Sequence, residues 1–534
     1  MNVGEFSGTG ALIRLILRRD RLLLPIWIAL PPLFVILVVA AFFSLYPTAA
    51  SQQMLAAQIV NSPGFVALLG PVSAPTIGGL TAWRSSLFVA VIVAGANALT
   101  VIRHTRADEE TGRYELLGSG VVGRRAPLSA SLVVTLGADL VIAALVAGGL
   151  VAFGLPVVGS VALGLSFAAI GWTFAALAGV AAQLAESAGV ARAIAAAIFV
   201  LFYVLRAVGD ANEQSGQSWL SWMSPIGWMR LVQPFANERW GVFALFLGAF
   251  IVLILMAYAL ASRRDVGAGI ISPRLGPTRA SQWLRGPLAL VWRLHRRTLL
   301  AWAALFAVYG IMIGYLATTS ADLLAANPQL ANLFAHFGGA SAYTDALFTL
   351  SLTFLGWVAA AYAITATLRL QSEEVEGRAD HVLATAVSRL RWAVSDLALV
   401  VIGSAVLLAA FGLPAGLAYG LSTGNVGYEL PRVLVATLAY LPAVWVVAGI
   451  AMAVYGLVPR LSFVSWGALG AFVLVELIGE TLQVSQSVLN ISPFNHVPEV
   501  LVSGVSVMPL VSLTLLALVL VIAGLVGFQR RSIG

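Results

Sequence analysis

Two segments of the chain carry the same pattern of carboxylates, glycine and arginine. The first is RADEETGRYELLGSGVVGRR at 106–125, and the second is QSEEVEGRADHVLATAVSRLR at 371–391. They align without a gap at a shift of 265 residues. The matched charged and glycine positions are Asp108 with Glu373, Glu109 with Glu374, Gly112 with Gly377, Arg113 with Arg378, and Glu115 with Asp380. Carboxylates and guanidinium groups form strong, directional hydrogen bonds, so the chemistry that this pattern predicts is recognition of a partner or of each other.

We expect each segment to turn at its glycine and continue as a short amphipathic helix. Glycine permits the positive φ of a tight turn, and residues 114–122 and 379–387 mix apolar and polar side chains. The apolar side chains placed to fill a groove in a partner are Leu116, Leu117 and Val121 in the first segment and Val382, Ala386 and Val387 in the second. One such segment would more simply be a solvated loop, but two copies at a constant shift favour paired docking surfaces.

Ionisable side chains also lie inside apolar stretches, at Asp139, Arg206, Glu476 and Glu480. Such groups are costly in lipid, so they are expected to face the protein interior and to pair. We expect Arg206 and Glu476 to meet across two halves of the chain as an outer gate or a polar anchor for substrate, with Asn97 as a further polar contact. The alternative is that Arg206 snorkels to the membrane surface and Glu480 is already solvated.

Other chemistry is excluded or unsupported. A nucleotide-binding P-loop needs a lysine to reach the phosphates, and the chain has no lysine, so we expect it neither to hydrolyse ATP nor to hold a cofactor. Cysteine is absent, and the five histidines show no metal-ligand spacing. No nucleophile elbow or other catalytic motif is present. We therefore predict a protein that is not an enzyme.

Composition indicates a membrane protein. Of the 534 residues, 60% are hydrophobic and only 10% are charged, and the mean hydropathy is +0.95. A net charge of +7 could indicate nucleic acid. However, the arginines lie between apolar segments, which is typical of the cytoplasmic face of a membrane protein and not of a nucleic-acid binder.

Twelve apolar segments are long enough to cross a bilayer, at roughly 20 residues each. They lie near Leu22–Tyr46, Ser85–Val101, Pro127–Leu150, Val161–Leu184, Ala188–Val208, Val242–Leu260, Thr298–Leu316, Leu347–Thr367, Trp392–Leu413, Val433–Leu457, Leu461–Glu480 and Pro509–Phe528. With both termini inside, all but five of the 30 arginines face the cytoplasm. No cleavable signal is evident at the N-terminus.

The spans divide into two equivalent halves. We assign residues 1–262 to the first six-span half, 263–297 to a basic linker with a second surface helix, and 298–534 to the second half. Ser224-Pro225 matches Ser492-Pro493 at a shift of 268. Because six is an even number, both halves keep one orientation and form a parallel repeat. The predicted fold is an all-α polytopic membrane protein of two six-helix bundles.

The pattern resembles the permeases of the second type of ABC exporter. The acidic pair, glycine and arginine-ended helix between spans two and three resemble that family's coupling helix. The basic helix at 10–21 resembles its elbow helix, and the tryptophan-rich stretch at 219–240 resembles its external helices. The likeness covers most of the chain in two fused copies, and is greatest to actinobacterial antibiotic and multidrug efflux permeases of twelve spans.

This resemblance implies the membrane subunit of an ATP-driven exporter in a bacterial plasma membrane. Two copies of a separate ATPase subunit, which bind ATP and Mg²⁺, would dock at the two segments, and an amphiphilic small molecule would pass between the halves. A proton-driven secondary transporter with Asp139 and Glu476 as proton carriers is the main alternative. A membrane enzyme acting on lipid-linked substrates is a weaker one, since it would need an acidic or metal cluster beyond the duplicated segments.

Overall fold

The computed structural model describes residues 3–60, 66, 69–113, 122–212, 218–265, 267–271, 284, 286–318, 340–478 and 485–531. Across these ranges all regular secondary structure is helical. Two predicted site residues, Glu115 and Glu480, and most of the helix expected at 114–122 lie outside the described residues. The chain folds as two compact units, residues 1–276 and 277–534, and the division falls inside the basic linker.

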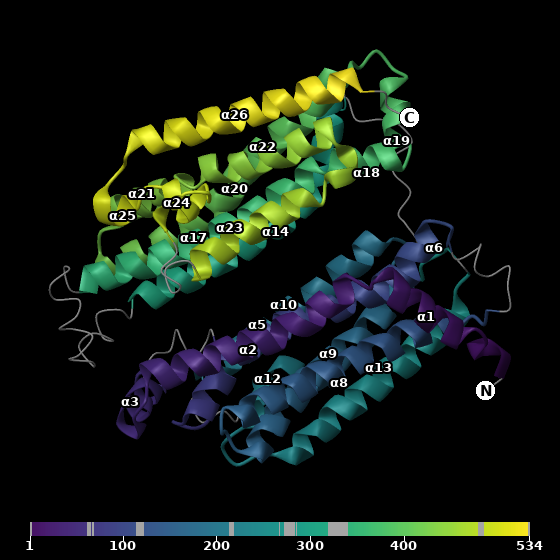
Figure 1. Ribbon diagram of the computed structural model, residues 1–534, viewed down its shortest axis with the longest axis vertical. Helices are drawn as coiled ribbons and strands as arrows, with labels where there is room; N and C mark the ends of the chain where they lie inside the picture. Colours follow the sequence, from purple (N-terminus) through teal and green to yellow (C-terminus); the bar gives the residue numbers. More distant parts are fainter. Residues whose placement is uncertain are drawn as a thin grey trace. The chain divides into compact units, whose positions relative to one another are not determined.

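The first unit is a bundle of long helices that run alongside one another, drawn in purple to teal in Figure 1. Its α-helices are α1 (Thr9–Arg19), α2 (Leu23–Leu45), α3 (Ala49–Val60), α5 (Ile77–Ile102), α6 (Asp108–Glu110), α8 (Ala126–Ala152), α9 (Val157–Leu184), α10 (Ala188–Asn212), α11 (Trp219–Trp222), α12 (Pro225–Leu231) and α13 (Phe243–Arg263). A π turn, η2 (Arg103–Ala107), joins α5 to α6.

The second unit, green to yellow in Figure 1, is also built of long and short helices. Its α-helices are α14 (Pro287–Thr318), α17 (Ala340–Thr367), α18 (Arg369–Val375), α19 (Arg378–Leu383), α20 (Arg389–Thr423), α21 (Val426–Leu438), α22 (Leu441–Leu457), α23 (Val464–Ile478), α24 (Gln486–Leu489), α25 (Val500–Ser503) and α26 (Val507–Arg530).

The all-helical, multi-span fold predicted from composition is confirmed. Within the part of the chain that the structure describes, 11 helices are long and apolar enough to cross a membrane. The remaining predicted span, Leu461–Glu480, corresponds to α23, whose described part has 15 residues. That is shorter than the roughly 20 residues a span needs. The twelve-span form and the parallel arrangement of the two halves stay predictions.

The fourth span of each half is its central helix. In the first unit, α9 packs against α5, α8, α10 and α13, and in the second, α22 packs against α17, α20 and α26. Small residues allow these close approaches, because membrane helices associate by packing of backbones and small side chains. A Cβ atom at Gly164 of α9 would lie 2.5 Å from the Ala143 carbonyl oxygen of α8.

The predicted second surface helix differs from the structure. In the first unit, α1 ends at Arg19 and a break at Asp20 separates it from α2. The Asp20 carboxylate is held by His104 at 2.6 Å and by Arg103 at 3.0 Å, which stabilises the break. In the second unit, residues from Pro287 onward continue without interruption into the span as α14. Residues 288–298 contain no glycine, proline or carboxylate that would end the helix.

Candidate functional site

The second span of the first unit ends in a dense network of charges, at the arginine-rich end of the bundle. The helix continues from α5 through the π turn η2 into α6, and π turns of this kind often lie at functional sites. Asp108 of α6 pairs with Arg19 of α1 at 2.8 Å. It also lies 3.6 Å from Arg113, beyond the glycine turn. Asp108 therefore ties the surface helix α1 to the end of the second span.

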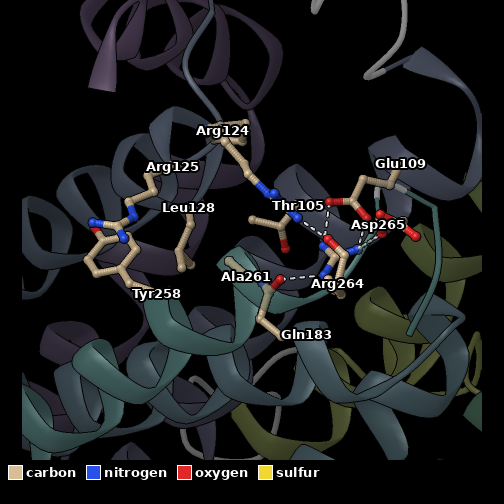
Figure 2. Close-up of a pocket in the computed structure, with 11 residues that line it drawn as sticks. Thr105, Glu109, Arg124, Arg125, Leu128, Gln183, Tyr258, Ala261, Arg264 and Asp265 are labelled. Carbon is tan, nitrogen blue, oxygen red and sulfur yellow. Dashed lines mark hydrogen bonds and ion pairs between the residues drawn. The ribbon is translucent and has the colours of Figure 1, made fainter. Parts of the chain in front are cut away.

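Glu109, the second acid of the pair, points into the same unit. Its carboxylate accepts bonds from Arg264 at 2.6 and 2.8 Å and from Arg106 at 2.8 Å. Arg264 follows the last helix of the unit, α13, and its Nε also donates to Gln183 Oε1 of α9 at 2.7 Å. Figure 2 shows this arrangement, in which Glu109 and Gln183 lie on either side of the Arg264 guanidinium. The surface segment is thus fastened to α13.

Arg106 extends the network to two further segments. Its side chain is only 1% exposed. Its Nε donates to the Glu186 carbonyl at 2.7 Å and its guanidinium also donates to the Gly267 carbonyl at 2.8 Å. The neighbouring Glu110 accepts a bond from the backbone N–H of Ala188 at 2.9 Å, at the start of α10. The end of the second span is therefore joined to the start of the fifth and to the chain after the sixth.

The second unit contains the equivalent arrangement. Glu374 accepts a bond from the Tyr455 hydroxyl at 2.7 Å and forms an ion pair with Arg531. Arg531 follows the last helix, α26, and its guanidinium lies 4.6 Å from the centre of the Tyr455 ring. Arg264 and Arg531 are 267 residues apart, close to the shift between Glu109 and Glu374. We call these two ion pairs, Glu109–Arg264 and Glu374–Arg531, the Glu–Arg clamps.

The glycine turns are also equivalent in conformation. Gly112 has a φ of 69° and Gly377 a φ of 70°, which is the left-handed region expected for such turns. Beyond the second turn, Arg378 donates to Glu373 at 2.7 Å, as Arg113 approaches Asp108 in the first unit. This hydrogen bond to Glu373 raises the pKa of the Arg378 guanidinium.

Asn97 and Asp139 meet inside the first bundle. The Asn97 amide of α5 donates to Asp139 Oδ1 of α8 at 3.0 Å. Asp139 is 1% exposed, and its Oδ2 has no hydrogen-bond partner among the described residues. The two side chains line a small pocket between α2, α5 and α8. That these two residues line a substrate path stays a prediction.

Arg206 is held inside its own unit, near the opposite end of the bundle. It lies 3.5 Å from Asp210, one turn further along α10, and Arg230 of α12 lies 3.0 Å from the same carboxylate. The Ser221 hydroxyl also donates to Asp210 at 2.8 Å. Arg206 and Asp210 are both buried, so the alternative that Arg206 snorkels to the surface is wrong.

Glu476 of α23 likewise has partners in its own unit. It accepts a bond from Trp357 Nε1 at 3.2 Å and another from the Ser492 hydroxyl. In the first unit the matching serine, Ser224, donates to the Phe202 carbonyl of α10 at 2.7 Å. In the first unit, therefore, the serine that follows the fifth predicted span is hydrogen-bonded back to that span. In the second unit, the serine that follows the eleventh predicted span is hydrogen-bonded back to it in the same way. That Arg206 and Glu476 meet across the halves stays a prediction.

Comparison with known proteins places this architecture in a family. The chain is 42% identical over 530 residues to the multidrug efflux system permease protein Rv1217c of Mycobacterium tuberculosis, covering 99% of this chain and 96% of that protein. It belongs to the family of this permease. Residues 284–529 also match the family described as multidrug efflux system permease Rv1217c, C-terminal domain.

The geometry of this permease corrects the direction in which the acidic pairs point. The sequence predicts that Glu109 and Glu374 pair with arginines of a partner or with the local Arg113 and Arg378. In the structure Glu109 pairs with Arg264 and Arg106, and Glu374 pairs with Arg531. Val382 and Val387 were expected to fill a groove in a partner, but they pack against the apolar core around Trp392. Ala386, the third of the predicted groove residues, is exposed, and the other exposed side chains of the second segment are both polar, as at Asp380 and His381, and apolar, as at Val375.

Four functional candidates in the permease were missed from the sequence alone. Arg264 and Arg531 look like part of the general excess of arginine. However, their spacing of 267 residues, close to the shift between the acidic segments, indicates that they are equivalent positions. Asp210 was overlooked, although its spacing of four from Arg206 predicts a pair on one helix face. Tyr455 gave no such signal, because a tyrosine in an apolar span is ordinarily a packing residue.

Proposed function

We propose that this permease is the membrane subunit of an ATP-driven exporter of amphiphilic small molecules. The observation that carries the proposal is the pair of Glu–Arg clamps. Each fastens an arginine-rich surface segment to the last helix of its unit through a largely buried ion pair. A surface segment that is rigidly joined to a transmembrane helix can pass a displacement from outside the bilayer into the bundle.

In this proposal the arginine-rich end faces the cytoplasm, in keeping with the positive-inside rule. Two copies of a separate ATPase subunit dock at 106–125 and 371–391. When ATP brings the ATPase subunits together, both segments move and the clamps carry α13 and α26 with them. The relative is named as a multidrug efflux permease, which supports drug-like cargo taken from the inner leaflet or the cytosol.

A proton-driven mechanism is the second candidate, because Asp139 is a buried carboxyl group with one free oxygen. The two mechanisms differ in their energy source. A proton-driven transporter exports cargo without an ATPase subunit and stops when a protonophore removes the proton gradient. An ATP-driven exporter needs its ATPase subunit, and it continues to export after a protonophore is added as long as ATP is supplied.

The test combines the purified chain with a candidate ATPase subunit. We expect the chain alone to show no ATP hydrolysis, because it has no lysine to form a P-loop. We expect the two proteins to co-purify, and efflux from vesicles to require ATP and both subunits. ATP turnover by the chain alone, or efflux that needs no ATPase and stops with a protonophore, would contradict the proposal.

A further inference from the structure

We infer that the Asp139 pocket of the first unit binds the cationic head of an amphiphile. This inference rests on the proposed function for its role in transport, but the binding itself needs neither ATP nor the ATPase. It names the class of cargo that the site selects: molecules with an aromatic or aliphatic body and a single positive charge.

The pocket combines a carboxyl group at one end with apolar walls. Its polar side chains are Asn97, Thr100, Thr135 and Asp139. The remaining lining residues are apolar or aromatic, and include Leu24, Trp27 and Ile28 of α2, Val93 and Ala96 of α5, and Ala138 and Ile142 of α8. Pockets that bind small molecules are typically apolar with a few placed polar groups that fix orientation and specificity.

The position of the pocket suits a molecule that enters from lipid. Asp139 is at the midpoint of the 27-residue helix α8, which places it near the middle of the bilayer. Leu24 and Trp27 lie in the first turns of α2, at the arginine-rich end of the bundle. The pocket therefore extends from the membrane centre toward the leaflet on the arginine-rich side, with its carboxyl group at the deep end.

The carboxyl group at the deep end has no cationic counterpart among the described residues. Among the residues that the structure describes, Asp139 takes part in no ion pair, and the Asn97 amide is its one hydrogen-bond donor. An isolated buried carboxylate is costly in a medium of low dielectric constant. A ligand that brings one positive charge into the pocket removes that cost, whereas an anionic ligand increases it.

The surrounding structure keeps room for the carboxyl group. On α9, a Cβ atom at Gly171 would lie 2.4 Å from Asp139 Oδ2, so only glycine fits against it. The lining residues of the pocket, Asp139 among them, come from α2, α5 and α8, and the unpaired Oδ2 is buried on the Gly171 side. Trp27 adds an aromatic face, and aromatic faces attract ammonium groups.

The experiment uses one fluorophore in three charge states. The probes are the trimethylammonium derivative of diphenylhexatriene, uncharged diphenylhexatriene, and its propionic acid derivative. Binding to the purified full-length permease in lipid nanodiscs is followed by saturable energy transfer from tryptophan, without ATP or ATPase. We expect the cationic probe to bind at least tenfold more tightly than the uncharged probe, and the anionic probe to bind most weakly.

Substitutions of Asp139 test whether its carboxyl group causes the preference for the cationic probe. Asp139→Asn, which keeps the size of the side chain, should weaken binding of the cationic probe about tenfold and leave the uncharged probe unchanged. Asp139→Glu should keep most of the charge preference, which separates lost charge from lost structure. Glu429→Gln is the matched control, because Glu429 pairs with Arg432 in the other unit. This variant should bind all three probes as the wild-type permease does.

Three results would overturn the inference. One is equal affinity of the wild-type permease for the cationic and uncharged probes. Another is a charge preference that survives Asp139→Asn. The third is that Asp139→Asn and Asp139→Glu both lower the affinities for the cationic and the uncharged probe by the same factor. Each of these is read without ATP hydrolysis, so it is distinguishable from failure of the ATP-driven mechanism.

Discussion

Replacing both Glu109 and Glu374 with arginine should reduce cargo-stimulated ATP hydrolysis and efflux at least tenfold while the ATPase still binds. Glu109→Arg would place a third guanidinium against Arg106 and Arg264, which already share that carboxylate. Breaking a buried ion pair by removing one partner costs about 3–5 kcal/mol, because the other charge is left uncompensated. The segments would then detach from α13 and α26. Efflux and ATP turnover in reconstituted vesicles measure the effect.

Exchanging the two charges of the first clamp should restore the activity that a single substitution removes. Glu109→Arg combined with Arg264→Glu rebuilds the ion pair in reverse and should recover a substantial part of the lost activity, whereas either substitution alone should not. Glu376→Arg is the matched control in the second segment, because Glu376 is 52% exposed and belongs to no clamp. It should alter activity less than twofold. Full activity in the Glu109→Arg, Glu374→Arg variant, with that variant folded, would show that the clamps transmit nothing.

Gly456→Ala should strongly destabilise the second unit and disrupt its clamp. A Cβ atom at Gly456 of α22 would lie 1.9 Å from the Gly524 carbonyl oxygen of α26, and backbone cannot move aside as a side chain can. Overpacking of this kind costs about 1–3 kcal/mol or more. Tyr455 is the adjacent residue, so separating α22 from α26 also pulls Tyr455 from Arg531 and Glu374. Thermal unfolding in detergent measures the loss.

Gly467→Ala is the control for this prediction. Gly467 lies in α23, and a Cβ atom there would meet nothing within 4 Å. Alanine should be neutral or slightly stabilising at that position, because it favours helix more than glycine does. Unchanged unfolding temperature and efflux in Gly456→Ala would mean that the two helices do not approach as closely as the structure places them.

Sequence reasoning captured the features that depend on local pattern. Hydropathy and arginine placement predicted the helical fold and the ranges of most spans. The positive φ of Gly112 and Gly377 agrees with the expectation that each segment turns at its glycine. Asn97 and Asp139 were both marked as polar groups inside spans, and they do meet. Each of these depends on residue types within one or two turns.

The features that sequence reasoning missed depend on contacts between distant segments. Glu109 and Arg264 are 155 residues apart, and nothing near either residue shows that they pair. The inward direction of the acidic pairs follows from where the last helix of each unit ends, which no local pattern contains. The apolar side chains after Gly377 could equally cover a partner or their own bundle, and only packing shows that they cover the bundle.

The central claim is that an ATPase docks at two equivalent surface segments, and site-specific cross-linking tests it most directly. The chain contains no cysteine, so one cysteine can be placed at Thr111, at His381 or, as a control, at Ser422 in the last turn of α20, at the far end of that helix. All three positions are exposed. With a benzophenone-maleimide label in membranes that contain both proteins, we predict cross-links to the ATPase from positions 111 and 381 and none from 422. Cross-links from 422 alone, or from none of the three in a complex that still hydrolyses ATP, would contradict the account.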